Sequence, residues 1–304
     1  MATIWVVMTL TFFCLRALPG GPFDAEKRLP PEIQQQIEAQ YHLDKPLFTQ
    51  YTYYLTDLAS GNLGPSYTYE SQPVSRIVLQ ALQVSGLIGG LALFTGIILG
   101  FILGVLPLFI QSRGLSRATD NLLSVLSYGG LSIPSFVLAG SLVLIFSLGL
   151  HWLPAARLQT PLHLILPVLS LSVVPLAYTV LWLRQGMADV LHHGFIQVKQ
   201  AFGLPRSNII LAHILRNGLL PWLSLIGPLA ATLLTGSFAI EFIFALPGLG
   251  KYFITAVSDR DYPLVMGVTL VYSLLLIGLN TFSDIASGLL DPRIRDGETG
   301  GASS

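Results

Sequence analysis

Residues 195–221 read FIQVKQAFGLPRSNIILAHILRNGLLP and lie between two long apolar runs of the sequence. The segment contains no Asp or Glu. The basic residues within it and just before it are Arg184, Lys199, Arg206 and Arg216. Gly203-Leu204-Pro205 breaks the pattern near its centre, and Pro205 is well placed to start the helix-like run that follows. We therefore expect an ordered, basic loop between two membrane helices that is presented to a partner.

The composition places most of the chain in lipid. Of the 304 residues, 52% are hydrophobic and 11% are charged, and the mean hydropathy is +0.67. A soluble domain carries about a quarter charged residues. The formal net charge of zero argues against a nucleic-acid partner. The single cysteine, Cys14, excludes an intrachain disulfide and a cysteine-based metal site.

Six apolar runs predict an all-α membrane protein with six transmembrane helices. The first, residues 2–18, is near the lower limit of about 17 residues for a spanning helix. The other five reach the roughly 20 residues needed to cross a bilayer. They cover residues 84–110, 122–150, 162–183, 219–242 and 264–290.

Small residues and prolines interrupt these runs. Gly96, Gly100 and Gly104 lie on one helix face, and this spacing favours close packing of another helix over a transport role. Other breaks predict bends inside the third and fourth runs, which are tolerated where the backbone is buried in protein or lines a cavity. They are Gly129-Gly130, Pro134, Pro167 and Pro175.

Residues 20–76 form another polar region, with seven acidic residues against four basic ones. Pro30 and Pro46 each precede a segment with helical spacing of apolar residues, so we expect two short amphipathic helices. Composition alone slightly favours a solvated region lying against the membrane or the protein. A docking surface is the alternative.

The basic residues predict the orientation of the chain. Six crossings put both termini on one side of the membrane. The basic residues expected on that side are Arg113, Arg117, Arg184, Lys199, Arg206, Arg216, Arg293 and Arg295. The short loops on the other side carry Arg157, Lys251 and Arg260. The positive-inside rule then places both termini and residues 195–221 in the cytoplasm, and residues 20–76 outside.

The motifs of covalent chemistry are missing, so we predict no catalytic, cofactor or metal site. There is no His-Glu-x-x-His or Gly-x-Ser-x-Gly motif, and adjacent His192 and His193 point to different helix faces. The segment ALPGLGK at residues 245–251 lacks the first glycine and the final Ser or Thr of a phosphate loop. Glu241 and Asp284 lie near the ends of their runs, where we expect hydration. An ion-coupled carrier would instead hold carboxylates near the midplane.

Several motifs resemble those of one transport family. Residues 201–221, with Ala201, Gly203, Ile209-Ile210 and Arg216-Asn217, resemble the EAA loop of ABC-importer permeases in the peptide and nickel branch. Similar landmarks are Gly236-Ser237 with Glu241 and Pro247-Gly248, Asp259-Arg260-Asp261-Tyr262-Pro263, and Asp291-Pro292-Arg293. Residues 19–46 most resemble the B subunit of bacterial oligopeptide permeases.

The resemblance implies a type I ABC-importer transmembrane fold and a role as a permease subunit in peptide import. It implies a homologous second permease, two ABC ATPases that bind the ATP, an extracytoplasmic peptide-binding protein, a peptide substrate and the lipid of a bacterial inner membrane. A helix over about residues 205–215 would seat its apolar side in a groove on an ATPase. The residues expected to serve coupling are Ala201, Gly203, Leu204, Pro205, Ile209, Ile210, His213, Arg216 and Asn217.

The expected organisation has four parts. They are a first transmembrane helix at residues 1–19, an extracytoplasmic segment at 20–76, a transmembrane domain at 77–290 with its coupling loop at 184–218, and a cytoplasmic tail at 291–304.

Two departures from the family stand out. The run before Gly203 is Val198-Lys199-Gln200-Ala201-Phe202 where the family has basic residues and alanines. The chain also begins inside its first predicted helix, which leads to the hypothesis that Met1 is a misassigned or truncated start. Three other classes remain open. They are a secondary transporter working alone, an intramembrane enzyme and a structural scaffold.

Overall fold

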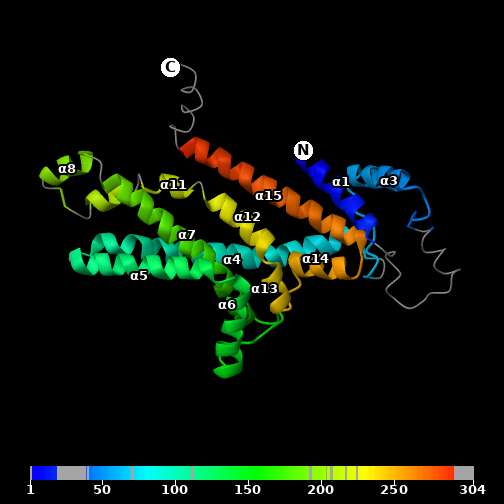
Figure 1. Cartoon of the computed structure of the whole chain (residues 1–304), viewed down its shortest axis with the longest axis horizontal. Helices are drawn as coiled ribbons and strands as arrows, with labels where there is room; N and C mark the ends of the chain where they lie inside the picture. The colour runs from blue at the N-terminus through cyan, green and yellow to red at the C-terminus, as the bar shows by residue number, and fades with distance from the viewer. Residues whose placement is uncertain are drawn as a thin grey trace, which may run out of the picture. The chain divides into compact units, whose positions relative to one another are not determined.

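The computed structural model describes residues 2–18, 39, 41–69, 72–110, 113–191, 194–202, 204–205, 208–215, 218–223 and 225–290. Within these ranges the chain is helical, and the one extended feature is an isolated bridge between Pro65 and Pro73. This confirms the predicted all-α class (Figure 1). The expected helix after Pro30 lies outside the described residues.

The helices follow the apolar runs, with several run ends shifted. The longer ones are α1 (Ala2–Ala17), α3 (Leu47–Ala59), α4 (Val74–Phe109), α5 (Arg113–Ser132), α7 (Ile165–Leu191), α12 (Ile226–Gly236), α14 (Leu249–Ser258) and α15 (Tyr262–Leu290). The shorter ones are α6 (Ser135–Leu142), η1 (Val143–Gly149), η2 (Pro161–Leu164), α8 (Gly194–Ala201), η3 (Ile209–Leu215), α11 (Leu220–Leu223) and α13 (Phe238–Ile243). Helix α3 begins directly after Pro46, as predicted for the second amphipathic helix.

Four described segments are long and apolar enough to cross a membrane, and they make the chain a multi-pass membrane protein. They are Val74–Phe109, Pro161–Leu191, Ile226–Ile243 and Tyr262–Ala286. A fifth is reached if Arg117–Ser132 and Ser135–Gly149 form one span. At 16 residues, α1 measures only about 24 Å against a hydrocarbon core of about 30 Å. By length and composition, the described residues therefore give four or five of the six expected spans.

The third apolar run is sharply broken where we expected a bend. Two helical segments, Arg117–Ser132 and Ser135–Gly149, meet at an angle of 98°. Pro134 stands between them. A proline lacks the N–H that a continuing helix needs, and it disfavours helical geometry in the residue before it. By contrast, Pro175 lies inside a continuous α7.

The chain forms two compact units. Unit 1 comprises residues 1–85 and 246–275, and unit 2 comprises residues 86–245 and 276–304. In unit 1, α15 packs closely on α4, since a methyl group added at Gly267 would lie 2.4 Å from Cγ1 of Val74. Buried Asp261 accepts hydrogen bonds from the Ser66 hydroxyl, from the Thr68 N–H at 3.1 Å and from the Leu264 N–H at 3.1 Å. The last of these caps the start of α15.

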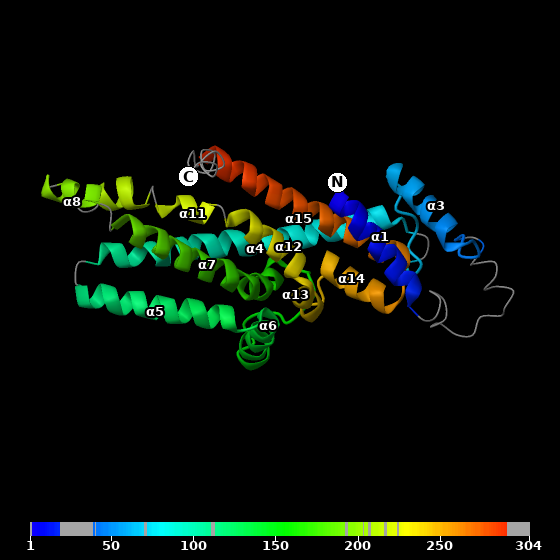
Figure 2. The same ribbon diagram turned by 45° about the horizontal axis from the view of Figure 1, so that its top comes forward.

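In unit 2, α4 and α5 both pack against α7 (Figure 2). A methyl group at Gly96 would lie 2.6 Å from Cγ of Pro175 and 2.7 Å from the Ser172 carbonyl oxygen. A methyl group at Gly100 would lie 2.7 Å from Cβ of Thr179. The predicted packing role of these glycines is therefore confirmed.

Candidate functional site

The segment between α7 and α12 holds the predicted functional residues. Helix α8 ends at Ala201, and the next helical turn begins after Pro205, as predicted. The Pro205 carbonyl accepts N–H bonds from Asn208 at 2.9 Å and from Ile209 at 3.2 Å. Residues Ile209–Leu215 then form a π-helix, within the range of about residues 205–215 where we expected a helix.

The wider turn of η3 brings its isoleucines together. A π-helix bonds residue i to residue i+5, so Ile214 returns close to Ile209 and Ile210. All three side chains are buried, while Leu211 and Ala212 between them are exposed. The apolar side of this helix therefore faces the interior of the chain itself.

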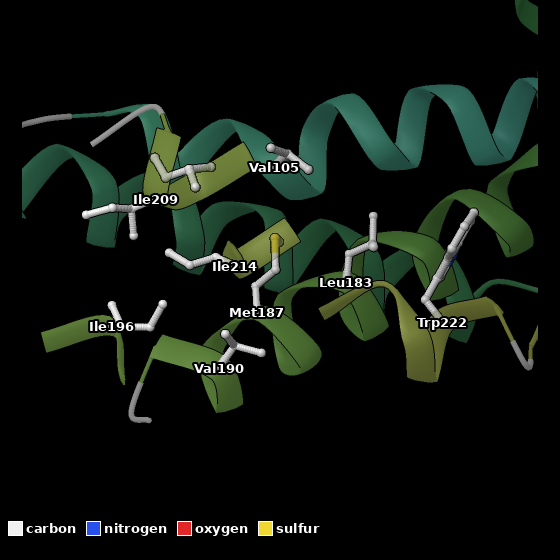
Figure 3. Close-up of a cluster of buried hydrophobic side chains, with 9 residues drawn as sticks. Val105, Leu183, Met187, Val190, Ile196, Ile209, Ile214 and Trp222 are labelled. Atoms are coloured by element: carbon white, nitrogen blue, oxygen red, sulfur yellow. The ribbon is translucent and has the colours of Figure 1, made fainter. Parts of the chain in front are cut away.

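A hydrophobic core, which we call the loop cluster, receives these isoleucines (Figure 3). Its buried members come from α4, α7, α8, η3 and α11. They are Val105, Leu183, Met187, Val190, Ile196, Ile209, Ile210, Ile214 and Trp222. In Figure 3, Ile214 lies beside Met187 of α7. Ile209 and Ile210, which we expected to seat in a groove on an ATPase, are buried in the loop cluster of the chain itself.

The other predicted coupling residues have different surroundings. Leu204 packs against the loop cluster, and His213 is partly buried. Ala201 and Pro205 are exposed. Gly203, Arg216 and Asn217 lie outside the described residues. Among the side chains of this segment whose exposure the structure describes, the large exposed apolar ones include Phe202, at 82%, and Leu211 and Val198, at 54% each.

The end of the segment is held against α7 by a pair of glycines that sequence reasoning missed. A methyl group at Gly186 would lie 2.4 Å from the Gly218 carbonyl oxygen, and one at Gly218 would lie 3.0 Å from the Met187 nitrogen. Only residues without a side chain permit this approach. The available signal was a glycine in α7 and another just after Arg216-Asn217, but nothing local indicates that they meet.

An ion pair joins α7 to α5 near the same segment. Nη2 of Arg184 lies 2.6 Å from Oδ2 of Asp120, and Nη1 donates to Oγ of Ser124 at 2.7 Å. We expected Arg184 to be part of a basic loop surface. Its side chain is instead only 16% exposed, against 44% for Asp120.

A cavity of about 810 Å³ in unit 2 lies among α4, α5, α7 and the loop segment. Its polar wall includes Asp120, Ser124 and Arg184, and its apolar wall includes Ile209 and Ile210. In the described part of the chain, no group of three or more His, Cys, Asp or Glu side chains could hold a metal ion.

Glu241 differs from its expected hydrated state. It is fully buried, and the Ser237 hydroxyl donates to its Oε1 at 2.6 Å. Both residues belong to one motif of the family resemblance. About one turn of helix separates Ser237 from Glu241, and the hydrogen bond satisfies a carboxyl oxygen that water would otherwise solvate.

Comparisons with known proteins bear on the whole chain. Residues 96–296 match the family described as binding-protein-dependent transport system inner membrane component. The dipeptide transport system permease protein DppB of Bacillus subtilis (strain 168) is 41% identical over 97% of this chain and 94% of that protein. The oligopeptide transport system permease protein OppB of Haemophilus influenzae is 41% identical over 96% of this chain and 95% of that protein.

A solved structure agrees with the fold. The MetNI methionine ABC transporter in an inward facing conformation superposes with a TM-score of 0.58 over 73% of this chain and 99% of that chain. At 16% identity this likeness shows the fold alone. The fold is that of an ABC-importer permease.

The relatives are named as permease proteins, which are transport components rather than enzymes. Equal identity to a dipeptide and an oligopeptide permease does not separate those two groups. With a family match over most of its length, this multi-pass membrane protein belongs to the binding-protein-dependent transport system inner membrane components.

Proposed function

We propose that this chain is the permease subunit of an ATP-driven, binding-protein-dependent importer of peptides. The observation that carries the proposal is its 41% identity, over nearly the full length of both chains, to a dipeptide permease and an oligopeptide permease. In this role the chain lies in a bacterial inner membrane with both termini in the cytoplasm. It acts with a homologous second permease, two ATPases and an extracytoplasmic peptide-binding protein.

The segment from α8 to η3 is the point where the ATPases act on the chain. Its exposed surface, with Phe202, Pro205 and Leu211, makes the contact. Its buried isoleucines do not touch the ATPase, since they anchor the segment to α4 and α7 through the loop cluster. Movement of the ATPases would thereby shift α7 as a rigid element, and closely packed elements transmit such shifts in discrete steps.

Two roles are therefore divided between neighbouring residues of one π-helix. Leu211 belongs to the contact with the ATPase, and Ile210 belongs to the transmission of its movement. A carrier working alone would need neither role, and it would transport peptide on an ion gradient without ATP.

Co-purification of the ATPases with the permease tests the contact. Leu211→Asp should reduce the recovered ATPase at least about tenfold, because a charge replaces an apolar anchor at the contact. Leu115→Asp is the matched control, since Leu115 is also exposed but lies at the start of α5. Recovery of the ATPases at the wild-type level with Leu211→Asp would contradict this assignment.

A further inference from the structure

Unit 1 contains an arginine whose orientation is fixed by its neighbours. Nε of Arg16 donates to Oε1 of Gln50 at 2.8 Å. The two N–H groups of the Gln50 amide are taken by the carbonyl oxygens of Leu43 at 3.1 Å and Lys45 at 2.8 Å. The amide therefore has only its oxygen left for Arg16. The Cζ of Arg16 also lies 3.6 Å from the centre of the Phe12 ring, which covers one face of the guanidinium.

In the described part of the chain, the contacts of Arg16 use Nε and one face of the guanidinium, and the other two nitrogens of the group are Nη1 and Nη2. Within the described ranges, no carboxylate forms an ion pair with Arg16. A partly buried guanidinium is always charged and is stabilised by an anion. Its two parallel N–H bonds match the two oxygens of a carboxylate.

A cavity of about 270 Å³ lies beside this arginine. Its walls include Tyr41, Tyr67 and Tyr262, and the ring centres lie 4.6 Å apart for Tyr41 and Tyr67 and 6.4 Å apart for Tyr67 and Tyr262. Asp57, which is exposed, also lines it. The volume equals that of roughly nine water molecules in the liquid, enough for a carboxylate and an attached side chain.

Helix α1 turns this arginine toward the protein. Met8 and Phe12 lie on the buried face of α1, and Arg16 follows Phe12 by one turn on that face. The guanidinium lies beside the cavity and against Gln50 and Phe12, so the geometry favours a ligand from the aqueous side over a lipid phosphate.

We propose that the cavity beside Arg16, the Arg16 pocket, binds the free C-terminal carboxylate of a peptide. The carboxylate pairs with Nη1 and Nη2, and the side chain of the terminal residue packs on the tyrosine rings. The class of ligand rests on the proposed function. The pocket itself rests on the fixed guanidinium and the cavity.

Binding of one peptide in two forms tests the pocket. The probes are N-acetyl-Ala-Ala-Phe and its C-terminal amide, and the protein is the full chain in nanodiscs of phosphatidylcholine. Isothermal titration should give an affinity for the acid at least about tenfold higher than for the amide, since the charged hydrogen bonds are made by the acid alone. Arg16→Gln should bring this ratio of affinities to about one. Arg16→Lys should reduce the ratio, because lysine lacks the two parallel N–H donors of the guanidinium.

The control is Arg76→Gln, which removes an exposed arginine from the first turn of α4 in the same unit and should keep the ratio. A thermal melt of each variant verifies that it is folded. Equal affinity of the wild type for both probes, or an unchanged ratio in Arg16→Gln, would overturn the proposal. So would displacement of the acid by inorganic phosphate or by phosphatidylglycerol in the nanodisc at equal concentration, which would mark a site for phosphate. ATP-driven uptake that persists alongside any of these results would leave the proposed function standing.

Discussion

Arg184 and Asp120 form the best-placed charged contact between two helices of unit 2. The distance of 2.6 Å and the added bond from Nη1 to Ser124 at 2.7 Å fix the geometry. Asp120 is 44% exposed, so solvent screens much of the attraction. The pair therefore sets the register of α5 on α7 more than it stabilises the fold.

A double-mutant cycle measures the coupling energy between Asp120 and Arg184. Asp120→Asn, Arg184→Gln and their combination should give a coupling energy of about 0.5–1 kcal/mol in reversible unfolding. Arg76→Gln, which removes an exposed arginine from the first turn of α4, should show no coupling with Asp120→Asn. A coupling energy near zero for the Arg184 cycle would mean that the pair contributes nothing to the contact.

The raised pKa of Tyr67 should make the folded state less stable at alkaline pH. Burial raises the pKa of Tyr67 well above its ordinary value of 10, with Arg16 opposing the shift and Asp261 reinforcing it. Above about pH 10 the unfolded chain releases this proton while the folded chain keeps it, so stability falls as pH rises. Between pH 9 and pH 11, the Tm of Tyr67→Phe should fall less than the Tm of the wild type. Tyr53→Phe, which changes an exposed ring, should follow the wild type, and identical slopes for all three would contradict the assignment.

At the scale of elements, α4 and α7 meet where side chains are missing. Gly96 and Gly100 bring the two backbones together, and the atoms that a methyl group would meet include backbone carbonyl oxygens that cannot rotate away. The loop cluster lies on the same face of α7 one or more turns further along. Close packing in this part of α7 therefore makes the helix a single stiff element.

Two glycines of α4 provide a matched test of this packing. Gly96→Ala should destabilise the chain by about 1–3 kcal/mol, because the new methyl group would lie 2.6 Å from Pro175. Gly90→Ala should stabilise it by about 0.5–1 kcal/mol, because no atom lies within 4 Å and alanine favours the helix. Equal effects of the two substitutions on unfolding would show that the helices do not meet at Gly96.

The π-helix η3 places a buried side chain, Ile210, next to an exposed one, Leu211. Ile210→Asp should destabilise the loop cluster by about 2–5 kcal/mol, since it places a charge among buried apolar side chains. Leu211→Asp should leave unfolding within about 0.5 kcal/mol of the wild type, because Leu211 is exposed. Unfolding in detergent distinguishes the two, and equal losses would contradict the π-helical register.

Features that depend on local pattern could be predicted from the sequence. Helix α3 starts after Pro46, a helical turn starts after Pro205, and Gly96 lies at a helix contact, because spacing and proline chemistry act over a few residues. The break at Pro134 was expected, but its angle was not. A proline forbids the continuing bond without fixing the direction of the next helix.

Features that depend on distant partners could not be predicted. Arg184 meets Asp120 across 64 positions, and the burial of Ile209 and Ile210 requires side chains from α4 and α7. Glu241 lies near the end of an apolar run, so local sequence predicts hydration, while the tertiary fold buries it. Ile209, Ile210 and Ile214 come together because Ile209–Leu215 form a π-helix. The spacing of these isoleucines in the sequence does not indicate a π-helix.

At the scale of the whole molecule, the Arg16 pocket combines residues that precede the family match, such as Arg16 and Gln50, with Tyr262, which lies inside it. The family match covers residues 96–296, and α1 and α3 precede it. The peptide permeases named above align over 96% or more of this chain, so the likeness to them extends over most of that N-terminal part as well.

Uptake of a labelled peptide into proteoliposomes tests the central claim most directly. The vesicles hold this chain, its second permease and the two ATPases, with the peptide-binding protein on the opposite side. We predict uptake that requires both ATP and the binding protein, and that stops with a non-hydrolysable ATP analogue. Uptake by this chain alone, driven by an ion gradient without ATP, would contradict the account.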